Sequence, residues 1–180
     1  MVPEAPLERT EAWLRPAGDG WFVLNAREAP WAQGDGISAS CELEGPAEFE
    51  QVGIFLRVLR PGEPVALYHW EADQEGFLIL SGEAVLIVEG TERPLRQWDF
   101  FHCPPGTKHI VVGAGEGACV LLSVGAREHQ DGPGWGAFPV DETAIRHGAG
   151  VEAETNSGAE AYASWPKRRL GPYQEGWLPD

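Results

Sequence analysis

Basic residues are scarce in this 180-residue sequence: Lys and Arg together number 13 against 28 Asp and Glu, which gives a formal net charge of −15. So acidic a chain repels a phosphate backbone and an anionic membrane surface, and we expect neither nucleic acid nor membrane as a partner. Long apolar runs are also lacking, and none approaches the roughly 18 residues that a membrane-spanning helix needs. Residues 1–15 carry several acids and no apolar segment, which argues against a signal peptide.

Cysteine is nearly absent. The three cysteines, Cys41, Cys103 and Cys119, are odd in number and widely spaced. This pattern argues against a disulfide framework and favours a reducing, cytoplasmic location. No GxGxxG, P-loop, HExxH or GxSxG motif occurs, so the sequence gives no support to nucleotide-cofactor or serine-hydrolase chemistry.

What remains is ordinary globular composition, with 43% hydrophobic and 23% charged residues, and a length that suits one structural domain. The 23 glycines and 15 prolines favour turns over long helices. Short apolar runs bounded by Gly, Pro or charged residues predict the strands of an antiparallel barrel or sandwich, all within residues 51–126. These runs are 53–59, 65–70, 77–80, 84–88, 98–102, 110–112 and 118–124. We expect hairpin turns at 81–83 and 89–92.

Two arms flank this predicted barrel. In the N-terminal arm, residues 1–50, we expect a short helix at 9–14 and a strand at 21–24. The C-terminal arm, residues 127–180, contains two helix signals. Asp141 is placed to cap a helix over 142–147 that Gly148 ends, and Ser157 is placed to cap one over 158–164.

Six of the eight tryptophans lie in the arms: Trp13, Trp21, Trp31, Trp135, Trp165 and Trp177. Large aromatic side chains are costly to leave in water, so we expect the arms to be ordered and packed. They pack either on their own barrel or across a contact with a second subunit, and both arrangements can hold together.

Histidine and glutamate gather in two short stretches of the predicted barrel. His69 and Glu71 lie two positions apart, so in a strand they point to the same side. Glu75 and His109 each open an apolar run, at a strand end. Two imidazoles and one or two carboxylates converging in this way suit a divalent Zn, Fe, Ni or Mn ion.

These stretches resemble the two signature motifs of the cupin superfamily. Glu75, six residues and Gly82 match the end of the first motif, and His69-x-Glu71 matches its His-x-His when Glu replaces the second His. Pro104-Pro105-Gly106-Thr107-Lys108-His109 matches the second motif without a gap. The resemblance covers about residues 50–126, and the chain also looks similar to small bacterial single-domain cupins of uncharacterised function. It implies an all-β double-stranded β-helix, an antiparallel jelly-roll barrel, with N- and C-terminal arms that contain short helices.

The sequence departs from the motifs at four positions. Gly62 stands one residue too far before His69, Trp98 replaces the first glycine of the second motif, and Gly113 replaces its final Asn. Glu71 replaces a ligand histidine. By resemblance His69, Glu75 and His109 are metal ligands, and Glu71 is either a fourth ligand or a free carboxylate that acts as a general base.

The resemblance implies two kinds of function. One is metal-dependent dioxygenase-, isomerase- or decarboxylase-like chemistry on a small organic molecule. The other is non-catalytic binding or sensing of a small ligand in the same pocket. Because cupins commonly dimerise, we also expect a homodimer. His102 and Cys103 are neighbours, and we expect the cysteine to be in the core and the histidine to be exposed.

Overall fold

The structure, a computed structural model, describes residues 1–45, 48–130 and 132–179. The first strands are β1 (Leu7–Arg9), β2 (Leu14–Pro16), β3 (Trp31–Gly34) and β4 (Ile37–Cys41). The central ones are β5 (Val52–Leu59), β6 (Trp70–Glu71), β7 (Glu75–Ser81), β8 (Glu83–Val88), β9 (Thr91–Arg96), β10 (Phe100–Cys103), β11 (His109–Ala114) and β12 (Cys119–Ala126). They are followed by β13 (Gly136–Ala137), α1 (Glu142–Arg146), α2 (Gly158–Ala161) and β14 (Arg169–Gly171). No helix among these residues is long and apolar enough to cross a membrane.

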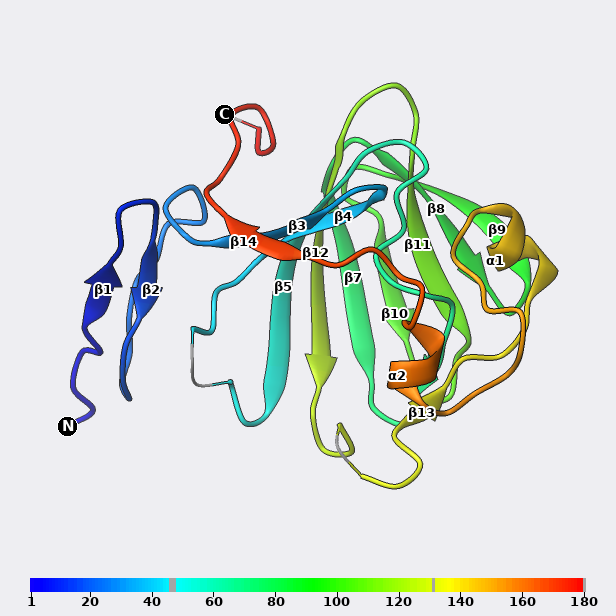
Figure 1. The fold of residues 1–180 in the computed structure, drawn as a ribbon, viewed down its shortest axis with the longest axis horizontal. Coiled ribbons are helices and arrows are strands. Elements are labelled where there is room, and N and C mark those ends of the chain that lie inside the picture. The colour runs from blue at the N-terminus through cyan, green and yellow to red at the C-terminus, as the bar shows by residue number, and fades with distance from the viewer. Residues whose placement is uncertain (46–47, 131, 180) are drawn as a thin grey trace.

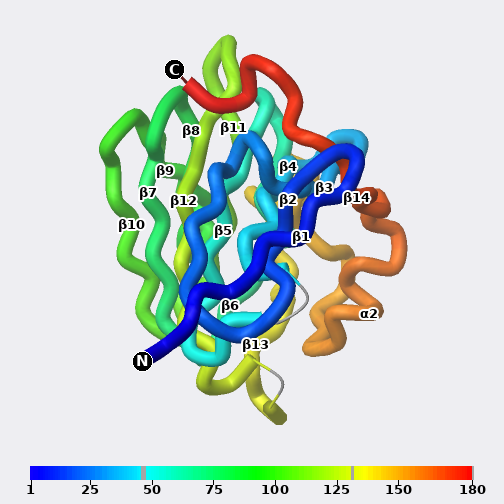
Figure 2. Tube along the Cα trace, turned by 90° about the vertical axis from the view of Figure 1, so that its left-hand side faces the viewer, coloured from blue at the N-terminus to red at the C-terminus, as the bar shows by residue number. Residues whose placement is uncertain are grey.

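Two antiparallel sheets form the body of the molecule (Figure 1). The larger has the order β10-β7-β12-β5-β4-β3-β14, and the smaller has the order β11-β8-β9. A hairpin of β1 and β2 stands at one end of the molecule, the end that faces the viewer in Figure 2, and β6 pairs with β13. The predicted all-β antiparallel fold is therefore confirmed.

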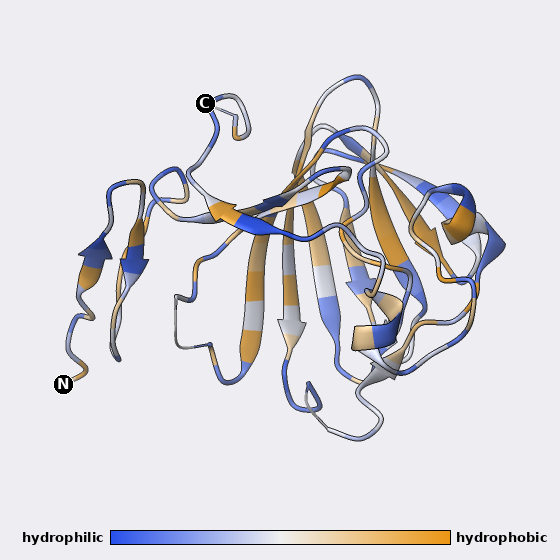
Figure 3. Cartoon of the chain, viewed as in Figure 1, coloured by the Kyte–Doolittle hydropathy of each residue, from blue (hydrophilic) through white to orange (hydrophobic). Residues whose placement is uncertain are grey.

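The core lies between the two sheets. One buried cluster joins Leu59, Ile79 and Leu121 of the larger sheet to Ile87 and Val111 of the smaller. Figure 3 shows hydrophobic colouring along the strands that carry this cluster, and hydrophilic colouring on many of the connecting segments. Burial of alternating side chains from both sheets provides the main stabilisation of such a sandwich.

The arms extend the larger sheet. β3 and β4 precede the central strands in the chain and β14 follows them, yet β14 pairs with β3, in register Leu170↔Ala32. Trp31 is fully buried, and its ring centroid lies 5.0 Å from that of Trp177 and 6.1 Å from that of Tyr173. These tryptophans pack on their own sheet, as one of the two predicted arrangements requires, whereas Trp21 is 51% exposed.

The helix expected at 9–14 is wrong. The segment forms the turn between β1 and β2, whose register pairs Arg9 with Leu14. The Thr10 hydroxyl accepts hydrogen bonds from the backbone N–H groups of Ala12 and Trp13, at 3.2 and 3.0 Å. A threonine that bonds to nearby backbone in this way competes with helix formation. The described part of the N-terminal arm therefore contains strands and no helix.

Three other local predictions also need correction. Of the strand expected at 21–24, only Trp21 forms a bridge, to Glu4. The apolar run 65–70 is irregular except at its end, where the isolated bridge of His69 and the first residue of the two-residue β6 replace the expected strand. The segment 81–83 is not a hairpin turn, because β7 and β8 belong to different sheets. The chain changes sheets there, whereas 89–92 forms the predicted hairpin between β8 and β9.

The helix signals of the C-terminal arm are confirmed at their starts. Asp141 Oδ1 accepts from Ala144 N at 2.9 Å at the start of α1, and Ser157 Oγ accepts from Glu160 N at 3.3 Å at the start of α2. Gly148 follows α1 with a φ of 67°, as a terminating glycine does. α2 ends at Ala161, earlier than expected.

Gly82 marks the change of sheet, and we expect Gly82→Ala to destabilise the fold. Its φ is 76°, and a Cβ there would press on the Ala118 carbonyl oxygen and lie 2.8 Å from Cys119 Cα. Gly62, with a φ of 83° and open space around it, is the matched control. Gly62→Ala should cost about 1–2 kcal/mol from its φ alone, and Gly82→Ala roughly 1–3 kcal/mol more from crowding. Urea unfolding measures both, and equal costs would contradict the steric argument.

Candidate metal site and pocket

Backbone pairing places two histidines side by side. His69 N donates to His109 O at 3.2 Å, and His109 N donates to His69 O at 2.8 Å. His69 therefore sits in an isolated bridge just before β6, while His109 opens β11. Their ring centroids are 5.0 Å apart. Glu71 lies on β6, and Glu75 opens β7.

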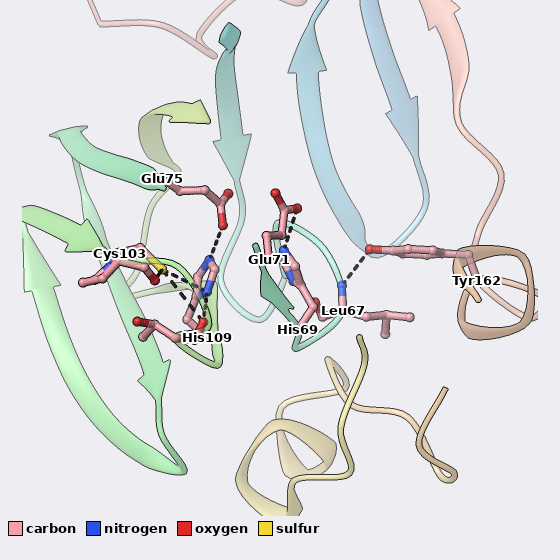
Figure 4. A network of polar contacts seen from close by, with 9 residues as sticks. Leu67, His69, Glu71, Glu75, Cys103, His109 and Tyr162 are labelled. Atoms are coloured by element: carbon pink, nitrogen blue, oxygen red, sulfur yellow. Dashed lines mark hydrogen bonds and ion pairs between the residues drawn. The ribbon is translucent and has the colours of Figure 1, made fainter. Parts of the chain in front are cut away.

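The side chains of His69, Glu75 and His109 converge on one point. One potential ligand atom from each lies within 4.8 Å of the others. His109 Nε2 is 3.3 Å from Glu75 Oε2, and His69 Nε2 is 3.3 Å from Glu71 Oε1. Glu71 is not a member of that three-residue group, and it lies beside the group on the side of His69 (Figure 4).

The other ring nitrogen of each histidine is held by a backbone carbonyl. His69 Nδ1 lies 2.6 Å from Leu67 O, and His109 Nδ1 lies 3.0 Å from Thr107 O. Because a carbonyl only accepts, each Nδ1 carries a hydrogen, and each Nε2 of a neutral ring is left with a lone pair. This arrangement is typical of histidines that bind metal through Nε2.

Two of the converging atoms lack a hydrogen-bond partner among the described residues. Glu75 Oε2 and His109 Nε2 are buried and make no hydrogen bond within the described chain, although they are neighbours. Buried polar atoms without partners are rare in native proteins. A cation between them would satisfy both, so the residues present fit a bound metal ion.

Without a cation, the charges of the site are poorly balanced. Burial and then the charge of Glu71 raise the pKa of Glu75 to about 7. Burial and then the neighbouring His69 lower the pKa of His109 to about 3. Burial alone would lower the pKa of His69, but hydrogen bonding to Glu71 and the charge of Glu75 outweigh it and raise that pKa.

A cavity of about 410 Å³ opens onto this group. Aromatic side chains form much of its wall, including Phe55, Phe77, Trp135 and Phe138. Polar groups besides the His/Glu cluster also face it, namely Arg57, Arg127 and Tyr162. A largely apolar pocket with a few convergent polar groups is the usual form of a small-molecule site.

Sequence reasoning missed the cationic and phenolic members of this wall. Arg57 lies on β5 between Phe55 and Leu59, at an inward position of an apolar strand. A charged residue at an inward position of an apolar strand can be recognised in the sequence, and it indicates a polar group that faces the interior. Tyr162, by contrast, comes from the C-terminal arm, and no local pattern places it beside β5.

The remaining candidates behave as expected. Cys103 is buried and its Sγ lies 3.3 Å from His109 Nδ1, while His102 is exposed. Burial raises the pKa of the Cys103 thiol to about 12, which makes it a poor nucleophile. Outside this group, the half-exposed His129 pairs with the buried carboxylate of Asp73, Nδ1 to Oδ1, at 2.7 Å.

These features define the class of the protein, an all-β sandwich whose inner pocket contains a His/Glu cluster. Residues 55–125 match the family model of the cupin domain. Over these residues the match confirms the resemblance to cupins seen in the motifs. No curated protein matches the chain.

Two solved structures with TM-scores above 0.5 agree on the fold. A cupin from Shewanella frigidimarina described as RmlC-like is 15% identical, with 62% of this chain and 96% of that chain covered and a TM-score of 0.52. A predicted oxalate decarboxylase from Thermotoga maritima is 20% identical, with 58% and 98% covered and a TM-score of 0.51. A putative sugar phosphate isomerase from Acidithiobacillus ferrooxidans is 29% identical over 43% of this chain, with a TM-score of 0.41. The present chain covers about half, 51%, of that isomerase.

Proposed function

We propose that His69, Glu75 and His109 hold a divalent transition metal and that the pocket acts on a small organic molecule. The observation that carries this proposal is the pair of buried, unpartnered atoms, Glu75 Oε2 and His109 Nε2, which face one another beside His69. Two imidazoles and one carboxylate form a donor set that suits Fe(II), and also Zn, Mn or Ni, with positions left open for a ligand.

When bound, such a metal acts as a Lewis acid toward substrate oxygens or supports reaction with O₂. The chain's own residues supply the rest. The carbonyls of Leu67 and Thr107 orient the two imidazoles. The carboxylate of Glu71, partly exposed to the cavity, takes a proton from the substrate and returns it. The aromatic wall limits water around the reacting group.

This arrangement supports isomerase-, decarboxylase- or dioxygenase-like chemistry, in which a proton is transferred within the substrate or one of its carbon–carbon bonds is broken. The alternative is that the same pocket binds or senses its ligand without turnover. The homodimer and the cytoplasmic location expected from the sequence stay predictions.

Elemental analysis of protein purified without a histidine tag tests the metal site. We expect about one Fe, Mn, Zn or Ni ion per chain in the wild type and none in His109→Ala. The control is His102→Ala, which removes an exposed histidine nearby and should keep the metal. A wild type that neither contains nor takes up any of these metals would refute the proposal and favour the non-catalytic alternative.

A further inference from the structure

Arg57 is a half-buried cation in the wall of the pocket. It lies on β5, flanked across the sheet by Ser40 of β4 and Leu121 of β12. Its Nε and Nη1 atoms are buried and make no hydrogen bond to any described residue. Its one close contact of note is the ring of Phe55, whose centroid lies 4.8 Å from the guanidinium carbon. Burial of an unpaired charge is costly, so its presence calls for a reason other than stability.

A second guanidinium stands near the first. Arg168 Nη2 donates to Ser38 Oγ and to Val65 O, both at 3.3 Å, and this holds it beside the pocket. Arg57 and Arg168 line a neighbouring cavity of about 350 Å³, which shares Arg57 and Tyr162 with the main one. Burial, and then the charge of Arg168, lower the pKa of Arg57 to about 10. Arg57 therefore remains protonated at neutral pH.

Tyr162 adds a neutral donor to the wall of the cavity that these cations line. Its hydroxyl oxygen accepts a hydrogen bond from Leu67 N at 3.2 Å, so the hydroxyl hydrogen is left to donate elsewhere (Figure 4). Two guanidinium groups and a phenol hydroxyl at one end of a cavity form a donor set for an oxyanion.

The nearby acids do not neutralise this end. Glu42 feels the charge of both Arg57 and Arg168, yet no ion pair or hydrogen bond joins it to either within the described residues. Arg127, in the wall of the main cavity, is by contrast paired with an acid. It donates to both carboxylate oxygens of Glu44, at 2.7 and 2.9 Å. In a chain with a net charge of −15, two neighbouring arginines without such a carboxylate are a local reversal of charge.

We propose that Arg57, supported by Arg168 and Tyr162, binds a carboxylate or phosphate group of the pocket's ligand. The ligand's other end then reaches His69, Glu75 and His109, a part of the inference that rests on the proposed function. The substrate class is thus a small organic anion. Arg57 sets specificity by charge, since a neutral analogue would leave its guanidinium unpaired.

Calorimetric titration with succinate and with inorganic phosphate tests the site and distinguishes the two anions. We expect the wild type to bind at least one probe, and Arg57→Met to weaken that binding by at least about tenfold. Arg93→Met removes an exposed arginine from β9 and should bind as the wild type does. Arg57→Lys keeps the charge without the planar fork and should bind more weakly than the wild type. The inference fails if neither probe binds the wild type, or if Arg57→Met binds as well as the wild type.

Thermal unfolding of the same variants separates ligand binding from a structural role. Since Arg57→Met replaces a guanidinium whose buried Nε and Nη1 atoms lack partners with an apolar side chain of similar length, its melting temperature should equal or exceed that of the wild type. A marked fall would indicate that Arg57 is structural and would overturn the inference. Metal content is measured alongside. Arg57→Met should retain the metal, while His109→Ala should lose it and still bind the anion, so failure of the metal site and failure of the anion site give different results.

Discussion

Glu75→Gln is expected to empty the metal site, whereas Glu71→Gln is expected to leave the metal bound. Glu75 Oε2 is buried, lies 3.3 Å from His109 Nε2 and has no hydrogen-bond partner within the described chain, so a bound metal ion would supply the partner that its carboxylate lacks. Loss of even an outer-shell partner weakens metal binding about 10–100-fold, and loss of a direct ligand should exceed that range. Titration of chelator-treated protein with Co(II), followed by visible absorbance, measures the affinities.

Glu71 lies outside the three-residue group, so its substitution should lower the turnover rate and leave the affinity for metal unchanged. Loss of a general base lowers kcat by roughly 10²–10⁴-fold once a substrate is known. The exposed Glu89 serves as control, and Glu89→Gln should change neither kcat nor the affinity for Co(II). If Glu71→Gln loses Co(II) as completely as Glu75→Gln, Glu71 is the fourth ligand that the sequence left open, and its role as a base falls.

The contact between His69 and Glu71 was predicted on a partly wrong basis. The sequence argument placed both in one strand, where positions two apart share a face. In the structure only Glu71 belongs to a strand, and His69 reaches the same point through its bridge to His109. The motif spacing predicted which residues lie close together, because it reflects how far the turns between strands carry the chain. It did not predict the backbone path.

Other parts of the fold escaped sequence reasoning because their signals are weak or distant. β9 is polar and exposed and contains Pro94, as an edge strand can, so it lacks the apolar run that marks its neighbours. The pairing of β14 with β3 joins residues more than a hundred positions apart, such as Arg169 and Gln33. The same long-range return of the chain brings Tyr162 to the pocket and Arg168 to the neighbouring cavity. Local pattern contains no information about such a return, although it did predict the caps of α1 and α2.

Trp31→Ala is expected to cost about 3–5 kcal/mol of stability, the usual range for removing a fully buried large aromatic side chain. Trp31 has no exposed surface, and its Nε1 donates to Ala26 O at 2.9 Å. Its ring packs against Trp177 and Tyr173, so one side chain ties β3 to the end of the chain. Urea unfolding followed by circular dichroism measures the loss.

Trp21→Ala is the matched control, because Trp21 is also in the N-terminal arm but is 51% exposed. Its loss should cost less than about 1 kcal/mol, as expected for a surface position. Two arrangements of the arms then give different results. If the arms pack on their own sheet, Trp31→Ala destabilises the protein by the same amount at every protein concentration. If they are held by a second subunit, the loss depends on concentration, and Trp21→Ala becomes costly as well. Because Arg168 directly precedes β14, the strand that pairs with β3, the first arrangement also means that packing around Trp31 supports the cationic end of the pocket.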